Sequence, residues 1–368
     1  MTSKGYVDMK KVTACVLTAV GIALACAADN SLSDFPRAAG EIDDTARLQR
    51  AVDATPSGVL HIPAGVYLIS STVSVTNLCS LEMNKSAVLR AVKEMPFVLR
   101  VNNVLRESLP RDSDRYNDYN MFVTGGQIDG NALAGCMMLD GFFHYTLRDT
   151  TFLNGRKYGL SVCGENSGGA ELVANNLYFR CVKSGLAGNT AVYVRGGDSH
   201  YTDCIAVDYT IGFHLAKGGS NRLTRCHVWG GPLPAPHKGE PREMLKGSIN
   251  FKINGAAALL RDCYADTGEI GFDIDAWDTR ILGCSYVNNK VFGLDNITVF
   301  RHKYGRLLVK DCTGVKPSAH SKVYEGCGTV EWRDMMYINY APTDDCPGAL
   351  KFDKPPTDEG KVDSLLVE

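Results

Sequence analysis

The chain has 368 residues, with 39 Lys plus Arg against 41 Asp plus Glu and a formal net charge of −2. This balance, without any run of Lys or Arg, excludes the electrostatic footprint of a nucleic-acid-binding protein. Hydrophobic residues make up 45% and charged residues 22%, which excludes an intrinsically disordered chain because enough apolar surface is available for a core. The length fits one large domain, since all-β solenoids often exceed the usual domain size.

The amino terminus has the organisation of a secretory signal. Met9 and two lysines precede an apolar run over residues 12–26, and small residues then form an A-x-A cleavage pattern. The run is too short to span a bilayer, and no later segment resembles a membrane span. We therefore interpret residues 1–28 as a signal peptide, with translation starting at Met9, and expect the mature protein to be secreted or periplasmic. Lipid attachment at Cys26 is the alternative, but the expected aliphatic residue before that cysteine is missing.

Three segments near the start of the mature chain resemble a known fold. They are Asp43-Asp44-Thr45 with the amphipathic stretch 46–54, the segment 58–69, and the turn 125–131. In these segments the chain resembles the pectate-lyase-like (pectin lyase-like) superfamily of right-handed parallel β-helices. The resemblance implies an all-β solenoid with a short N-terminal capping helix. Asp44 or Thr45 would cap this helix, and Leu48, Ala51 and Val52 would plug the open end of the solenoid.

The resemblance predicts a fold and leaves the reaction open. The superfamily includes pectate and other polysaccharide lyases, polygalacturonase-type hydrolases, epimerases and viral tailspikes, and a shared fold does not imply a shared function.

A repeat organises the remainder of the chain. Equivalent positions are marked by four cysteines 22, 37 and 21 residues apart, namely Cys204, Cys226, Cys263 and Cys284. Each repeat holds short strands of alternating apolar and polar residues between Gly or Asn turns, without helical periodicity. Such a unit cannot bury its apolar face alone, so the units must stack. The pattern predicts a parallel β-helix over residues 29–340, followed by a solvated C-terminal tail over residues 341–368.

The cysteine pattern favours buried thiols. Two of the 13 cysteines lie in the signal peptide, which leaves eleven, an odd number. Residues that repeat once per coil stack about 4.8 Å apart, whereas a disulfide needs Cβ atoms about 3.8 Å apart. We therefore expect the periodic cysteines to form an inward ladder of small hydrophobic residues. Cys327 and Cys346 are the best candidates for a disulfide, and no Cys or His spacing predicts a zinc site or another metal site.

One sheet is predicted to carry polar columns on its outer surface. Aligning the strand after each glycine turn gives two inward columns, Leu160, Val192, Phe213, Ile249 and Phe272, and Val162, Val194, Leu215, Phe251 and Ile274. Residues between them point outward. The first outward column is Ser161, Tyr193, His214, Asn250, Asp273 and Asp295, and the second is Cys163, Arg195, Ala216, Lys252 and Asp275. These side-chain types on successive coils are typical of a catalytic surface.

We predict that Asp273, Asp275, Lys252 and His214 are catalytic and that Tyr193, Arg195, Asn250, Asp295 and Trp277 bind substrate. Each has a structural alternative. Lys252 over Asp275 would be a surface ion pair worth less than about 1 kcal/mol. His214 would be a solvated surface histidine. Trp277, like Trp229, would pack at the edge of the structure instead of forming a sugar platform. Because both aspartates face solvent in this register and repel each other, Asn replacements should change the free energy of unfolding by less than about 0.5 kcal/mol.

An elongated groove on an exported β-helix suits a polysaccharide substrate. Asp273 and Asp275 approach the roughly 6.5–9.5 Å separation of an inverting glycoside hydrolase, the reaction that we favour. The alternative is a polysaccharide lyase acting by β-elimination on a uronate-containing glycan. Lys252, Arg195 or His214 would then act on the substrate, and the carboxylates would hold Ca²⁺, the only cofactor considered.

Two further expectations concern the surroundings of the groove and its use. The insertion between Gly230 and Gly247 is expected to form one wall. The hydrolase motifs of polygalacturonases and the calcium signature of pectate lyases are missing, so neither reaction is carried over from the resemblance. A non-catalytic glycan-binding or surface-structural β-helix is the remaining alternative. The sequence predicts no oligomeric state.

Overall fold

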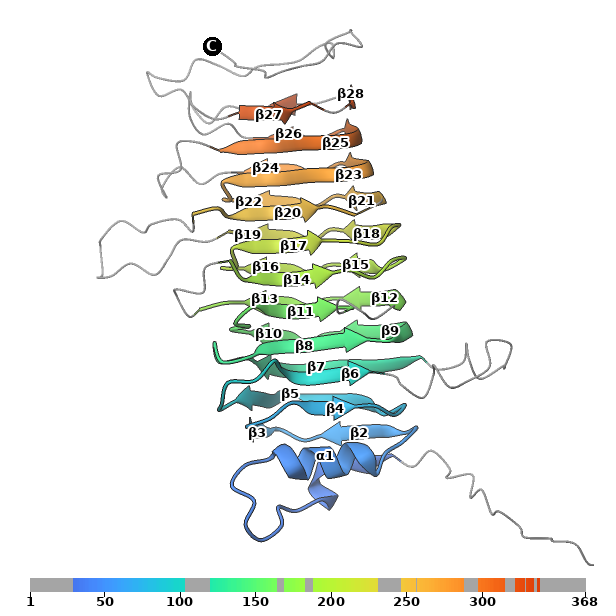
Figure 1. Cartoon of the computed structure of the whole chain (residues 1–368), viewed down its shortest axis with the longest axis vertical. Coiled ribbons are helices and arrows are strands. Elements are labelled where there is room, and N and C mark those ends of the chain that lie inside the picture. Colours follow the sequence, from blue (N-terminus) through green and yellow to red (C-terminus); the bar gives the residue numbers. More distant parts are fainter. Residues whose placement is uncertain are drawn as a thin grey trace, which may run out of the picture.

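The computed structural model describes residues 29–102, 120–163, 169–182, 188–230, 246–255, 257–287, 297–314, 322–327, 329–333 and 336–337. Their strands pair in parallel from coil to coil and stack into one elongated solenoid (Figure 1). The predicted parallel β-helix is therefore confirmed. No helix in these ranges has the length and apolar character required to cross a membrane.

Three faces, each a ladder of parallel strands, make up the wall of the solenoid. Face 1 contains β4 (Val73–Val75), β6 (Phe97–Asn102), β8 (Gly135–Asp140), β11 (Tyr158–Val162), β14 (Thr190–Val194), β17 (Ile211–Leu215), β20 (Ile249–Ile253), the first parts of β23 (Ile270–Leu282) and β25 (Thr298–Lys310), and β27 (Lys322–Gly326).

Face 2 follows around the first corner. It contains β1 (Asn30–Ser31), β2 (Val59–Ile62), the first parts of β5 (Ser80–Ala91) and β7 (Met121–Asp129), β9 (Phe142–Arg148), β12 (Gly169–Asn175), β15 (His200–Thr202), β18 (Asn221–Thr224), β21 (Ala257–Arg261), the second parts of β23 and β25, and β28 (Thr329–Arg333).

Face 3 closes the coil. It contains β3 (Gly65–Ile69), the second parts of β5 and β7, β10 (Thr151–Leu153), β13 (Tyr178–Arg180), β16 (Ile205–Val207), β19 (His227–Trp229), β22 (Tyr264–Asp266), β24 (Ser285–Val287), β26 (Thr313–Gly314) and β29 (Met336–Tyr337).

The core consists of side chains stacked on their equivalents one coil away. On face 1 the stack runs Leu160, Val192, Phe213, Phe251, Phe272 and Phe300, all buried. Neighbouring Phe rings in it have centroids 5.8, 5.3 and 5.1 Å apart and lie nearly parallel. The predicted register is therefore wrong at β20, because Phe251 pairs with Phe213 where Ile249 was expected, a shift of two residues.

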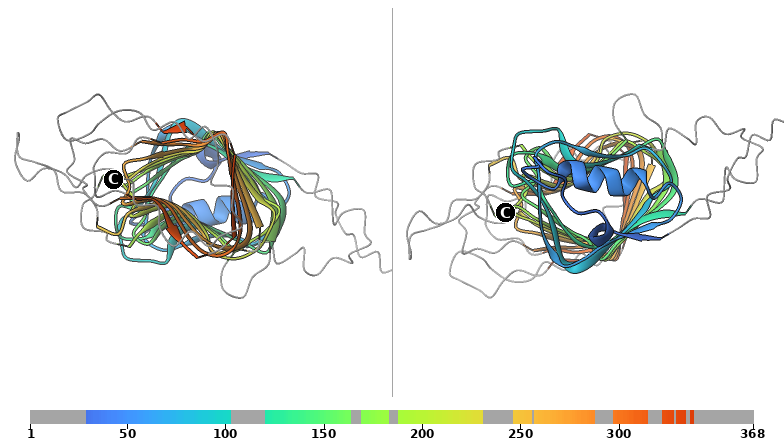
Figure 2. Two further views of the ribbon diagram at one scale, coloured as in Figure 1. Left: turned by 90° about the horizontal axis from the view of Figure 1, so that it is seen from above. Right: turned by 90° about the horizontal axis from the view of Figure 1, so that it is seen from below.

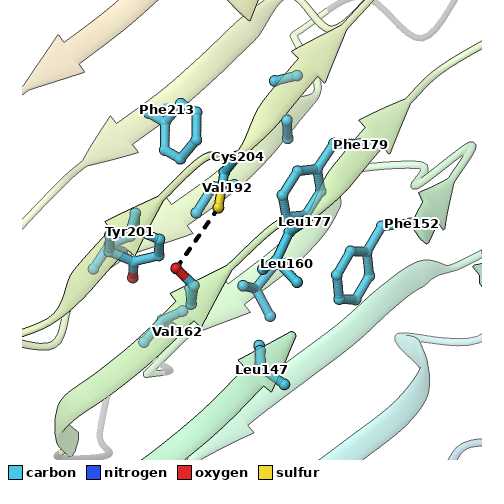
Figure 3. Close-up of a cluster of buried hydrophobic side chains, with 14 of the residues drawn as sticks. Leu147, Phe152, Leu160, Val162, Leu177, Phe179, Val192, Tyr201, Cys204 and Phe213 are labelled. Carbon is cyan, nitrogen blue, oxygen red and sulfur yellow. Dashed lines mark hydrogen bonds between the residues drawn. The ribbon is translucent and has the colours of Figure 1, made fainter. Parts of the chain in front are cut away.

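The ladder of buried cysteines is confirmed, and its origin lies in the turn between face 2 and face 3. A residue with φ of 51 to 62° occupies this turn in successive coils, at Asp149, Asn176, Asp203, Arg225, Asp262, Gly283 and Asp311. In the last five of these coils the next residue is a cysteine that points inward, giving Cys204, Cys226, Cys263, Cys284 and Cys312, each at most 1% exposed. Figure 3 shows Cys204 among the buried side chains of the core, which include Leu177 and Phe179.

Helix α1 (Thr45–Asp53), which follows the 3-10 turn η1 (Leu32–Asp34), closes the N-terminal end of the solenoid (Figure 2). Its residues Leu48, Ala51 and Val52 are fully buried, as predicted. Asp44 is the N-cap residue, but its carboxylate makes no capping bond to the helix. It accepts hydrogen bonds from Arg37 and from the Leu68 backbone instead, so it fastens the helix to the loop before it and to β3.

Thiol titration tests the cysteine ladder. Nine of the ten described cysteines are buried and all ten are free thiols; burial raises the pKa of Cys79 and of Cys163 to about 12. We expect only Cys327 among the ten to react rapidly with a thiol reagent in the native protein. Denaturant without reductant should release the other nine, and finding them in disulfides would contradict the observed register. The predicted partner of Cys327, Cys346, lies outside the described residues.

Candidate functional site on face 1

The outward column of face 1 crosses nine coils in an unbroken register. It runs Arg100, Met138, Ser161, Tyr193, His214, Lys252, Asp273, Arg301 and Glu325. Tyr193, His214 and Asp273 therefore share one column, as predicted. Lys252 joins them between His214 and Asp273, because the two-residue shift at β20 moves it out of the second column. The predicted stacking of Lys252 on Asp275 is wrong, since its Cα partner is Asp273.

Asn250 lies away from this surface, which contradicts its predicted substrate-binding position. It is 0% exposed, and its side-chain amide donates hydrogen bonds to the backbone oxygens of Val228 (3.2 Å) and Asp266 (3.1 Å). Ile249, Asn250 and Phe251 at the start of β20 are all buried, so simple alternation along the strand does not apply there. Asn250 thus holds the corner of its coil together.

Asp273 is a buried, paired carboxylate and does not face solvent as predicted. Arg301 donates two hydrogen bonds to it, at 2.8 and 2.7 Å, and Lys303 Nζ lies 3.6 Å from Oδ1. Asp273 is 1% exposed. Burial alone would raise the pKa of this carboxyl, but the Arg301 hydrogen bonds and the charges of Arg301, Lys303 and Lys252 together hold the pKa below its ordinary value. Asp273 is therefore ionised at neutral pH.

His214 is half-buried between aromatic and cationic neighbours. Its Nε2 lies 3.0 Å from Oδ1 of Asn254, and the ring of Tyr193 packs edge-on with centroids 5.2 Å apart. Burial and the charge of Lys252 lower the pKa of His214, against smaller opposing effects of Asn254 and Asp273. Because its pKa is lowered, the imidazole is neutral at pH 7. An amide oxygen only accepts, so Nε2 carries the one hydrogen of the neutral ring and Nδ1 is its basic nitrogen.

An aromatic stack lies beside the column on the N-terminal side of Tyr193. Tyr193 stacks on Tyr158 with centroids 4.8 Å apart, and Tyr158 stacks on Phe97 at 6.4 Å. Lys157 Nζ lies 5.1 Å from the centre of the Tyr158 ring. Because these rings cover one another's faces, they present mainly edges and hydroxyl groups to a ligand.

The second outward column differs from the prediction at two positions. Cys163 is buried, 1% exposed, and does not point outward as predicted. Asn254 occupies the place assigned to Lys252, between Ala216 and Asp275. Arg195 and Asp275 are half-buried, and among the described side chains neither forms an ion pair within 4 Å. These two groups can therefore interact with a ligand without losing an internal partner.

The remaining predicted residues have different outcomes. Trp277 is 68% exposed at the corner between faces 1 and 2, whereas Trp229 lies on face 3, half-buried. Asp295 and most of the insertion after Gly230 lie outside the described residues. The position expected for Asp295 in the first column is occupied by Arg301.

Sequence reasoning missed Asn254, Arg301, Lys303 and Tyr304, which all line this surface. A signal for Arg301 was present. The segment Phe300-Arg301-His302 repeats the pattern of Phe272-Asp273-Ile274 with one inward position polar. Predicting Asn254 on this surface would have required the correct register at β20.

Comparison with known proteins adds information on the fold alone. No protein-family model and no curated protein matches the chain. Among solved structures, the surface adhesin PfbA of Streptococcus pneumoniae aligns with a TM-score of 0.52 at 13% identity, over 85% of this chain and 92% of its own. The catalytic unit of a GH87 α-1,3-glucanase from Streptomyces thermodiastaticus aligns with a TM-score of 0.50 at 13% identity, over 85% of this chain and 64% of its own.

ORF18 of Geobacillus virus E2 gives a TM-score of 0.49 at 13% identity, over 83% of this chain and 61% of its own. The chain thus spans less than two thirds of the length of the glucanase unit and of the viral protein. The chain has a right-handed parallel β-helix fold, and the predicted resemblance is confirmed at the level of the fold.

The Asp273–Arg301 pair should be required for stability. We expect Asp273→Asn to lower the free energy of unfolding at pH 7 by about 1–3 kcal/mol, because it leaves Arg301 without its buried partner. This reverses the small effect expected from the sequence. The pKa of Asp273 is lowered in the folded state, so its contribution is present above the unfolded pKa of about 3.9 and is lost as the pH falls below it.

Asp275→Asn is the matched control, and we expect a change within about 0.5 kcal/mol because Asp275 has no ion pair to lose among the described residues. Denaturant melts at pH 7 and pH 3 measure both variants. Equal stability of the two variants at pH 7 would contradict the assigned pairing.

The pKa of His214 should respond in opposite directions to its two polar neighbours. Lys252→Met removes a positive charge and should raise the pKa, whereas Asn254→Ala removes a hydrogen bond that raises it and should lower the pKa. Titration of the imidazole C–H signals by NMR, with His214→Gln for assignment, measures both shifts. An unchanged midpoint in Lys252→Met would show that Lys252 does not neighbour His214.

Proposed function

We propose that this protein is an exported, carbohydrate-active enzyme that cleaves an acidic polysaccharide on face 1 by β-elimination. The observation that carries the proposal is the adjacency of His214 and Lys252 in one column. A neutral imidazole next to an ammonium group supplies a base and a cation to one substrate. Export rests on the predicted signal peptide over residues 1–28.

The proposed reaction begins with His214. Its basic nitrogen removes the proton on the carbon next to the uronate carboxylate. The negative charge that develops on the carboxylate is stabilised by Lys252, which has no ion pair within 4 Å among the described residues. The electron pair then forms a carbon–carbon double bond and expels the glycosidic oxygen, which takes a proton from the hydroxyl of Tyr193. Arg195 binds a neighbouring carboxylate of the polymer.

The state of Asp273 supports elimination over the inverting hydrolysis that the sequence favoured. Hydrolysis needs a carboxylic acid that still holds its proton near neutral pH. Asp273 is buried under Arg301, and its pKa is lowered. It cannot donate a proton to a leaving oxygen without breaking two hydrogen bonds. On the face 1 part of β23, Asp275 is then left without a second available carboxylate, because Asp278 lies in the face 2 part of the strand.

Non-catalytic binding is the second candidate. The fold likeness to the adhesin PfbA is as good as the likeness to the GH87 glucanase, so the fold does not choose between adhesion and catalysis. The His214–Lys252 pair favours catalysis, since binding a carboxylate requires the ammonium but not a neighbouring imidazole whose pKa is lowered.

Product analysis tests the reaction. The protein is incubated with polygalacturonate, alginate, hyaluronan and neutral glucans, and we expect the ultraviolet absorbance of an unsaturated uronate from one of the acidic polymers. His214→Ala should lower kcat by about 10² or more, since acid–base catalysis contributes roughly 10² to 10⁴. Lys252→Met should move the acidic limb of the pH–rate profile to higher pH, because the base must be unprotonated.

Asp275→Asn is the control for a carboxylate mechanism and should retain most of the activity. New reducing ends without absorbance, abolished in Asp275→Asn, would establish hydrolysis instead. The Ca²⁺ that the sequence suggested for a lyase stays a prediction, and the rate with and without a chelator measures it.

A further inference from the structure

We propose that Trp277 and Tyr304 form a sugar-stacking platform at the corner of faces 1 and 2, where a ring of the bound polysaccharide rests beside Asp275. The inference rests on the proposed function only in that the ligand of face 1 is a polysaccharide. It adds a subsite on the two coils beyond Lys252, with Tyr304 as a residue that no sequence pattern indicated.

An irregularity in the sheet places both rings outside. The register between β23 and β25 shifts between Ile274 and Asp275, which makes Tyr304 the Cα partner of Asp275, and shifts back before Asp278. Ala276 and Trp277 are opposed by Gly305 alone, and such two-to-one bulges redirect side chains. Gly305 has φ +86°, and a Cβ there would lie 1.9 Å from the Ala276 oxygen, so this position requires glycine.

The two rings are accessible, unlike the other aromatic side chains of face 1. Trp277 is 68% exposed and Tyr304 is 55% exposed. Among the described residues no other ring contacts either of them, whereas Tyr158 and Tyr193 cover each other. Large apolar side chains left in water have a free-energy cost that a ligand can remove. The apolar C–H face of a pyranose matches an exposed ring face.

The backbone beneath the platform is held in place. His302 is fully buried and its Nε2 lies 2.8 Å from the Tyr304 backbone oxygen. Since a carbonyl only accepts, Nε2 donates this bond, and Nδ1 is left to accept from the Tyr324 hydroxyl at 3.3 Å. A rigid support reduces the entropy lost on binding.

The polar neighbours match a sugar better than a purely apolar ligand. Asp275 lies directly next to Tyr304 in the sheet, and the Lys303 side chain beside it is 49% exposed. A carboxylate and an ammonium can bond the hydroxyl or carboxylate groups at the rim of a ring whose face lies on the aromatic side chains.

The distance from His214 makes the platform a remote subsite. β23 lies two coils and β25 three coils beyond β17, which is roughly 10–14 Å at about 4.8 Å per coil. One sugar ring cannot span this separation. A substrate must therefore extend over several units to use the platform, which predicts an effect on long chains and none on the shortest cleaved oligomer.

Titration of intrinsic fluorescence and steady-state kinetics test the platform, with polygalacturonate, alginate, hyaluronan and a neutral glucan as probes. Trp277→Ala should raise the half-saturating concentration of the polymer about tenfold, as expected for an exposed aromatic anchor, and Tyr304→Ala severalfold. Trp277→Phe should retain most of the affinity. kcat/KM for the shortest cleaved oligomer should not change. Tyr178→Ala, a half-exposed aromatic on face 3, is the matched control.

The outcomes separate the two proposals. If the wild type binds a polymer and Trp277→Ala and Tyr304→Ala bind it equally well, the platform is overturned whatever the reaction. If binding weakens in these variants but no unsaturated product forms, the platform stands and β-elimination is overturned. If the wild type binds none of the four polymers, both are overturned.

Discussion

The stacking of each residue on its equivalent one coil away controls this structure. Parallel backbone hydrogen bonds fix the separation at about 4.8 Å, so a side chain at one position meets the same neighbours along the whole solenoid. Inside, this produces the Phe stack from Phe213 to Phe300 and the cysteine ladder from Cys204 to Cys312. On the outer surface, the same spacing brings ionisable groups closer together than they are on most open protein surfaces.

This spacing explains why the outer column of face 1 has two electrostatic halves. From Asp273 onward, unlike charges alternate, and the buried carboxylate is satisfied by Arg301 and Lys303. Before Asp273, Lys252 lies next to His214 with no ion pair within the described part of the chain, and burial together with the charge of Lys252 lowers the pKa of the imidazole. The half that begins at Asp273 stabilises the fold. The half that contains His214 and Lys252 keeps a base and a cation available.

Much of the fold could be predicted from the sequence, because the repeat, the inward cysteines and the capping helix depend on local patterns. Face 1 was harder. Ile249-Asn250-Phe251-Lys252-Ile253 keeps its alternation after a slip of two residues, so periodicity alone could not distinguish Asn250 from Lys252 in the column. Only the backbone pairing with Phe213 and Phe272 fixes the register. The partners of Asp273 lie 28 and 30 residues later in the chain, beyond the reach of any local pattern.

At the corner that carries Trp277, the regular coil-to-coil register is interrupted, and this interruption lets the surface present side chains that regular stacking would not expose. In a regular coil the residue at this position would follow its neighbours along the ladder and share their exposure. The register shift around Asp275 breaks that rule in two successive coils, with glycine at the crowded position and a buried histidine fixing the carbonyl of Tyr304. The regular columns therefore concentrate charge, and the irregular corner provides the exposed apolar surface that a regular column cannot.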